Sequence, residues 1–189
     1  METITINVFK DDVYEEVAKA TDYTGSKLID GDEGARDRIL AADDDLAELG
    51  RFWEESVTAV NENFKEMLVS GSTKQISVPL VMEFTTTKDS NTNVPSAQAA
   101  SIIIPDLQTT YVKKTGYEGV MEVSVAFDKA LTSSVQSTLR SFFIASIIGQ
   151  WFKFANKGEA ADYFTQAAEM LETAERMLYS RKKPKRPTT

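Results

Sequence analysis

The sequence contains no cysteine and no histidine among its 189 residues. The lack of cysteine excludes disulfides, thiolate-bound zinc and thiol nucleophiles, and it leaves the redox compartment open. The lack of histidine removes the side chain most used for acid–base catalysis near neutral pH and the commonest ligand of transition metals. Catalysis by carboxylates, lysine or tyrosine, or by Mg²⁺, remains possible.

Glycine clusters and long apolar runs are also missing. The nine glycines are scattered singly, so there is no phosphate-binding loop, Walker-type segment or serine elbow. These absences argue against an enzyme, and no cofactor or metal is expected. Residues 1–9 do not form a signal peptide, and the apolar stretch 142–154 is shorter than the roughly 20 residues that span a bilayer. We expect a soluble protein, made in the cytoplasm, with no membrane partner.

One charged segment contradicts the rest of the chain. A basic run near the C-terminus contains two prolines, and its residues are Arg181, Lys182, Lys183, Pro184, Lys185, Arg186 and Pro187. The whole chain carries a net charge of -8, so the chain without these five cations carries -8 minus 5, which is -13. The prolines oppose a helix and the like charges repel, so residues 181–189 are predicted to be a free arm or a docking peptide.

Two helices are predicted in the N-terminal third. The first begins at Asp11 and ends at Gly25, with carboxylates in its first turns. The second follows the capping residues 43–45 and ends at Gly71. It is the clearest amphipathic helix of the chain, because one face carries Leu46, Leu49, Trp53, Val57, Val60, Phe64 and Met67.

The C-terminal third predicts a pair of helices. Residues 133–154 are apolar nearly all round, which is typical of the central helix of a core. Residues 159–179 form an amphipathic helix after a short turn at 156–158. So short a connection between long helices implies an antiparallel hairpin.

Alternating apolar and polar residues predict strands at the start of the chain and in its middle. Residues 3–9 alternate as in a short strand or extended arm, and residues 76–84 alternate as a strand in which Pro79 favours an edge or bulge. Residues 85–100 are polar and predict a long exposed loop. Further strands are expected at 102–104, 107–112 and 120–127, with turns at Pro105 and at 116–119.

Together these elements predict an α+β fold, mainly helical, in which a helical bundle ends in a long antiparallel hairpin and a small antiparallel sheet is inserted. Residues 1–71 and 129–180 are expected to form the helical core, residues 72–128 the β-rich insertion, and residues 181–189 the basic tail.

Other candidate sites have simpler explanations. The acidic residues between 30 and 37 do not follow the ligand order of a calcium loop, and residues 43–45 are explained by helix capping. Helical spacing makes the large aromatic residues core residues before it makes them a ligand pocket. Exposure of any of them would instead indicate a subunit interface, for which the candidates are Phe142, Phe143 and Trp151.

The basic arm has three interpretations. It binds nucleic acid through phosphates, although an acidic body opposes this. It serves as a nuclear import signal, which applies only in a eukaryotic or viral setting. Or it docks in an acidic groove of a protein partner, where the prolines reduce the entropy lost on ordering.

The helical layout, the insertion at 72–128 and the ending from Tyr179 to Pro187 resemble the head-to-tail connector proteins of tailed bacteriophages, the neck ring or adaptor class beneath the portal. The ending is similar to that of connector-like proteins from phages and prophages of gut bacteria, including the crAss-like group. The insertion is larger than a minimal connector needs.

The resemblance implies a structural protein of the virion neck, assembled in the host cytoplasm as a homo-oligomeric ring, usually of about twelve copies. It implies that residues 181–187 dock into the portal protein and that other neck or tail proteins are neighbours. DNA would pass through the lumen without sequence-specific binding, because a negative wall repels phosphates. The alternatives are a nucleic-acid-binding or host-interaction protein that uses the basic arm and, more remotely, a carboxylate-based metal-dependent enzyme.

Overall fold

The computed structural model describes residues 1–27, 40–41, 45–79, 111–155 and 157–182. In chain order its elements are β1 (Glu2–Phe9), α1 (Lys10–Lys27), α3 (Leu46–Asn63), β2 (Leu68–Pro79), β3 (Tyr111–Val123), the 3-10 helix η2 (Lys129–Leu131), α4 (Thr132–Ala155) and α5 (Lys157–Leu178). The helices and the small three-stranded antiparallel sheet confirm the predicted α+β class.

By its contacts the chain divides into two compact units, residues 1–76 with 114–189 and residues 77–113. The larger unit contains all the helices named above and most of the sheet. The domain limits predicted at residues 71, 128 and 180 stay predictions.

The sheet joins segments that are distant in the sequence. Its strand order is β1-β3-β2, and β1 pairs antiparallel with β3, so that Glu2 lies opposite Val123 and Phe9 opposite Gly116. Ile4, Ile6 and Val8 are buried while the residues between them are more exposed. The strand predicted at 3–9 is therefore confirmed, and the sheet is not built from residues 72–128 alone.

Several glycines were misassigned by the sequence patterns. The turn predicted at 116–119 is wrong, because Gly116 and Gly119 both lie within β3. A Cβ at Gly116 would collide with the carbonyl oxygen of Val8, so glycine here lets two backbones approach closely. Gly25 lies inside α1 and Gly71 inside β2, so neither residue ends a helix.

Helix α3 has the predicted apolar face with different limits. Of the predicted stripe, Trp53, Val60 and Phe64 are completely buried, whereas Leu46 at the start is 52% exposed. Asp45 occupies the N-cap position, but its side chain makes no capping hydrogen bond. Residues 43 and 44 lie outside the described residues. The helix ends at Asn63, where a tight turn leads into β2.

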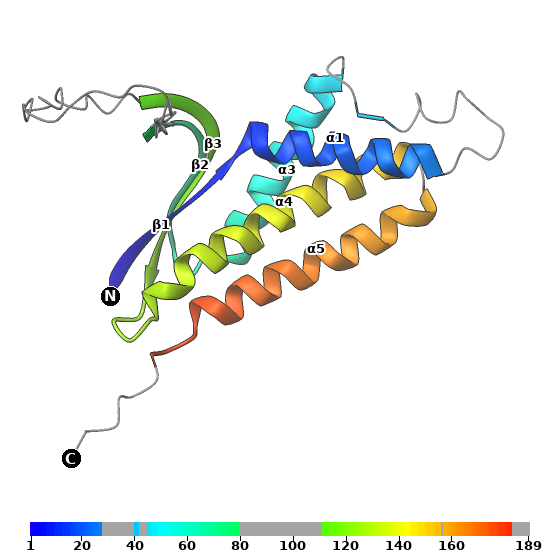
Figure 1. Ribbon diagram of the computed structural model, residues 1–189. Helices are drawn as coiled ribbons and strands as arrows, with labels where there is room; N and C mark the ends of the chain where they lie inside the picture. Colours follow the sequence, from blue (N-terminus) through cyan, green and yellow to red (C-terminus); the bar gives the residue numbers. More distant parts are fainter. Residues whose placement is uncertain (28–39, 42–44, 80–110, 156, 183–189) are drawn as a thin grey trace, which may run out of the picture. The chain divides into compact units, whose positions relative to one another are not determined.

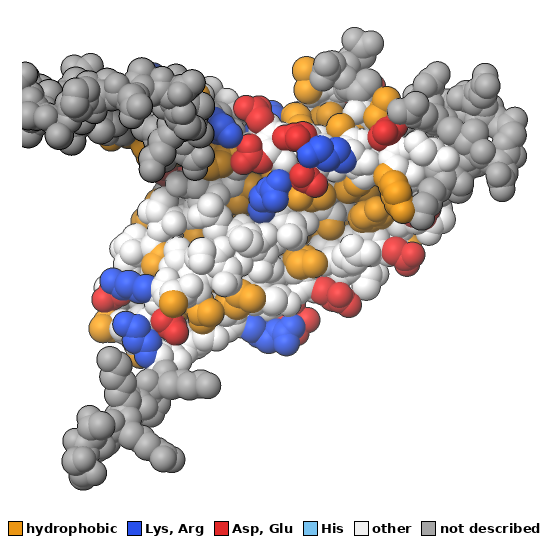
Figure 2. Space-filling view, in the orientation of Figure 1, with side chains coloured by type: hydrophobic (Ala, Val, Ile, Leu, Met, Phe, Trp, Pro, Cys, Tyr) orange, Lys and Arg blue, Asp and Glu red, His pale blue; other side chains and the backbone are white. Residues whose placement is uncertain are grey.

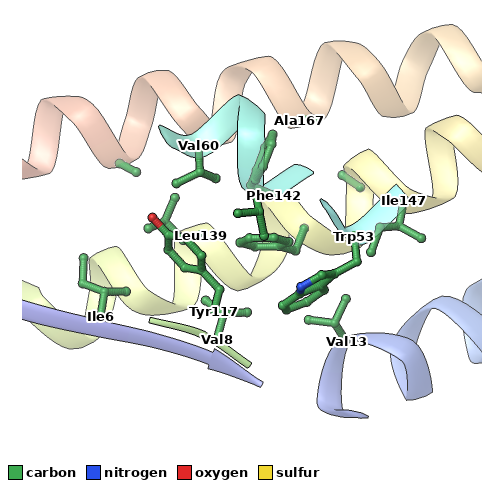
Figure 3. Packing of buried hydrophobic residues seen from close by; sticks show 14 of the residues in the cluster. Ile6, Val8, Val13, Trp53, Val60, Tyr117, Leu139, Phe142, Ile147 and Ala167 are labelled. Atoms are coloured by element: carbon green, nitrogen blue, oxygen red, sulfur yellow. The ribbon is translucent and has the colours of Figure 1, made fainter. Parts of the chain in front are cut away.

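Helix α4 is the centre of the larger unit, as predicted. It contacts α1, α3, α5 and β1, and in Figure 1 it lies between α1 and α5. Figure 3 shows Trp53 of α3 and Tyr117 of β3 converging on this helix. The ring centroid of Phe143 lies 4.6 Å from that of Trp53 and 5.6 Å from that of Tyr117. Three elements thus share one aromatic core.

Several predictions for the segment from residue 85 to residue 112 fall wholly or partly outside the described residues. This applies to the loop at 85–100, the strand at 102–104, the turn at Pro105 and most of the strand at 107–112. The strand predicted at 76–84 is the end of the longer β2, described as far as Pro79. The one predicted at 120–127 overlaps β3, which ends at Val123.

Candidate docking site

The start of the basic arm is fixed to the body of the larger unit. After α5 ends at Leu178, Arg181 forms an antiparallel bridge with Phe127. The backbone N–H of Lys182 donates a hydrogen bond of 2.8 Å to the carbonyl oxygen of Ala126. Phe127 is only 1% exposed, so this bridge is anchored in the core. The start of the arm is therefore held at a defined point of the body.

The predicted docking residues are only partly described. Arg181 and Lys182 are both exposed, which leaves their cationic side chains available to a partner. Lys183, Pro184, Lys185, Arg186 and Pro187 lie outside the described residues. The structure adds that Arg181 and Lys182 are held by their backbones while their charges face outward.

A groove lies where the arm begins. It has a volume of about 550 Å³, and we call it the C-terminal groove; its lining consists of Met1, Glu66, Met67, Glu122, Val123, Ser124, Val125, Leu178, Tyr179 and Arg181. The floor is largely apolar because Val123 and Leu178 are buried beneath it. Val125 and Tyr179 remain 69% and 59% exposed at its sides. The turn after α3, the end of β3 and the end of α5 meet here.

Carboxylates lie around this apolar floor. Glu66 and Glu122 line the groove itself, and a smaller adjoining hollow of about 150 Å³ adds Glu175. Within the described part of the chain, none of these three carboxylates forms an ion pair with a lysine or arginine. Arg181 and Lys65 are the basic side chains nearby. The arrangement is suited to an extended segment that carries both apolar stems and positive charge.

The predicted subunit interface needs correction. Phe142 is 3% exposed and Phe143 is completely buried, so both belong to the core and neither offers a surface to a neighbour. The reason is that α1, α3, α5 and β1 cover the apolar faces of α4 within one subunit. Trp151 is half-buried and keeps part of its surface.

Two phenols lie in or against the core, the buried Tyr117 and the half-buried Tyr14. Burial raises the pKa of Tyr117 to about 12, and burial together with the carboxylates of Glu54 and Asp11 raises that of Tyr14 further. The hydroxyl of Tyr117 donates to Oδ1 of Asn61 at 3.1 Å. Both phenols are neutral near pH 7. Among the residues that the structure describes, no group of three or more acidic side chains is arranged to hold a metal ion.

Figure 2 shows one face of the molecule, where acidic and basic side chains alternate over the helices and neither sign forms a continuous patch. In the described ranges no helix combines the length and apolarity of a membrane span.

The sequence patterns did not predict the groove. Its carboxylates, Glu66 and Glu122, belong to segments far apart in the chain, and neither stands in a motif. A local signal existed only for the arm that begins beside them.

No protein-family model matches this sequence, and comparisons with curated proteins and with solved structures also give no match.

Proposed function

We propose that the chain is a non-enzymatic structural subunit of a phage virion neck, forming a ring between portal and tail. In this proposal the basic arm docks into the portal protein, and DNA passes through the ring. The observation that carries the proposal is the bridge between Arg181 and Phe127, which gives a strongly cationic arm a fixed origin on a helical body.

A fixed origin matters for affinity. An arm tethered at a defined point loses less conformational freedom on docking than one attached through a mobile linker. We take α4 and α5 to be the helical hairpin that supports this origin, because residues on either side of the pair, Phe127 and Arg181, meet beside each other. The acidic body also suits a channel subunit, since net negative charge disfavours adhesion of DNA.

The contacts of the ring require surfaces other than the core of α4. Trp151 is the one residue of the predicted interface that retains exposed area, and Phe154 on the same helix is 74% exposed. We assign these two side chains to the contact with a neighbouring copy, in a head-to-tail arrangement that closes.

The test uses the full chain and the portal protein encoded in the same genome. Replacing the five cations of the arm with glutamine should leave the folded structure unchanged and weaken portal binding at least about 100-fold, because several charge-assisted contacts are lost together. A matched control replaces five surface cations of the body, Lys19, Arg51, Lys74, Lys129 and Arg176, and should bind nearly normally.

The proposal fails if the variant without arm cations binds the portal protein as tightly as the original chain. If instead the original chain binds duplex DNA with an affinity that falls steeply with salt, and the arm variant does not, the nucleic-acid interpretation of the arm is correct.

A further inference from the structure

The C-terminal groove lies directly on the path of the basic arm. Arg181 contributes to the lining of the groove and also forms the bridge with Phe127. Lys182 is hydrogen-bonded to Ala126, and the two preceding residues of the turn after β3, Ser124 and Val125, line the groove as well. The start of the arm at Arg181 therefore lies at the edge of the groove.

We propose that this groove is an intramolecular docking site for residues 183–187 of the same chain. The bridge between Arg181 and Phe127 is isolated, because Ser124 to Phe127 form a turn closed by a hydrogen bond from the N–H of Phe127 to the carbonyl oxygen of Ser124. Val125, in that turn, is 69% exposed and lines the groove beside Lys182's hydrogen-bond partner Ala126. Beyond Lys182 the arm lies across the groove as an extended segment held by its side chains.

Charge and shape favour this occupant. The arm supplies Lys183, Lys185 and Arg186, and the groove with its adjoining hollow supplies Glu66, Glu122 and Glu175. The aliphatic stems of lysine and arginine can lie on the apolar floor around Met67 and Val123 while their charged groups reach the carboxylates. The chain thus carries both the peptide and a groove that fits it.

The site goes beyond the proposed function, because it needs no partner. Its consequence is competition: an arm docked in its own subunit is withheld from any partner, and an acidic partner must displace it. Exposed ion pairs of this kind are individually weak and are screened by salt, so the docked state is easily exchanged.

The experiment uses engineered disulfides, which the absence of native cysteine makes unambiguous. One full-length variant combines Thr188→Cys with Val125→Cys in the groove. The matched control combines Thr188→Cys with Ala130→Cys, an exposed position on the other side of the Phe127 bridge that does not line the groove. A freely moving arm reaches both positions at comparable effective concentration.

The docked arm should form the intramolecular disulfide to position 125 at least about threefold faster than that to position 130. Adding Glu66→Gln and Glu122→Gln should remove this preference, and so should about 1 M salt, where the Debye length falls to about 3 Å. Adding Glu48→Gln and Glu55→Gln instead makes the same charge change on α3, away from the groove. These changes should leave the preference in place.

Equal rates for the two cysteine pairs would overturn the proposal. So would a product consisting of disulfide-linked dimers, which would show that the groove receives the arm of a second copy. Neither result depends on the portal protein, so failure here is distinguishable from failure of the proposed function.

Discussion

The buried phenol of Tyr117 provides a stability test whose sign changes with pH. Its ring is completely buried against Phe143, and its hydroxyl donates to Asn61, whose side-chain amide donates to the carbonyl oxygen of Gly71 at 3.1 Å. The interaction joins β3, α3 and β2. Tyr117→Phe removes only the hydroxyl group and keeps the ring packing.

Near pH 8 the substitution should lower the free energy of unfolding by about 1 kcal/mol, the net value of one hydrogen bond. At high pH the sign reverses. The pKa of Tyr117 is raised from 10.0 to about 12 on folding because burial disfavours the phenolate. The folded state therefore keeps the proton more strongly than the unfolded state. The contribution of the neutral phenol to the free energy of unfolding is fully present below pH 10, and it is lost as the pH rises through 12 because the unfolded state releases its proton first.

A shift of this size corresponds to about 2–3 kcal/mol, at about 1.4 kcal/mol per pKa unit. The original chain should thus be more stable than Tyr117→Phe at pH 8 and less stable at pH 12. Unfolding by denaturant at several pH values measures the difference in free energy of unfolding between the two proteins. The fluorescence of Trp53, which packs against the same Phe143 ring as Tyr117, monitors the unfolding. Deprotonation of lysines and of the other tyrosines affects both proteins and cancels.

The control is Tyr111→Phe, which alters a side chain that is 62% exposed and should leave stability close to that of the original chain. A difference between the original chain and Tyr117→Phe that stays constant from pH 8 to pH 12 would refute the assignment of a buried, neutral phenol.

Further substitutions, at two glycines and at a pair of serines, test the packing of the larger unit. Gly116→Ala should destabilise the fold by about 1–3 kcal/mol, because the added methyl group collides with the carbonyl oxygen of Val8. Gly50→Ala, in a helix where the added Cβ would lie 3.9 Å from Nζ of Lys10 without a collision, should stabilise by about 0.5–1 kcal/mol. Equal thermal shifts for the two variants would contradict the close pairing of β1 and β3. The hydroxyl oxygens of Ser56 and Ser146 lie 2.9 Å apart in the core, so Ser56→Ala alone should cost about 1–2 kcal/mol and the double alanine variant less than the sum of the two single changes. Strict additivity in denaturant unfolding would show that the two hydroxyl groups do not interact.

The sequence alone determined the features whose causes are local. The apolar stripe from Leu46 to Met67 predicted α3, which ends at Asn63, because residues three or four apart share one face of a helix. The all-round apolar character of residues 133–154 correctly placed α4 at the centre of the core. The basic residues and prolines defined the arm, since its charge and restricted backbone require no knowledge of the fold.

Only the tertiary structure decided which distant segments meet. Gly116 has the local signature of a turn but lies in a strand, because the backbone of Val8 approaches it from the other end of the chain. Phe142 and Phe143 were expected in the core, with an interface as the alternative if they were exposed, and the surrounding helices and β1 decide for the core by covering them. The C-terminal groove likewise depends on Glu66, Glu122 and Tyr179 from three separate elements. Periodicity reports the faces of one helix or strand, whereas a groove is formed by the packing of several.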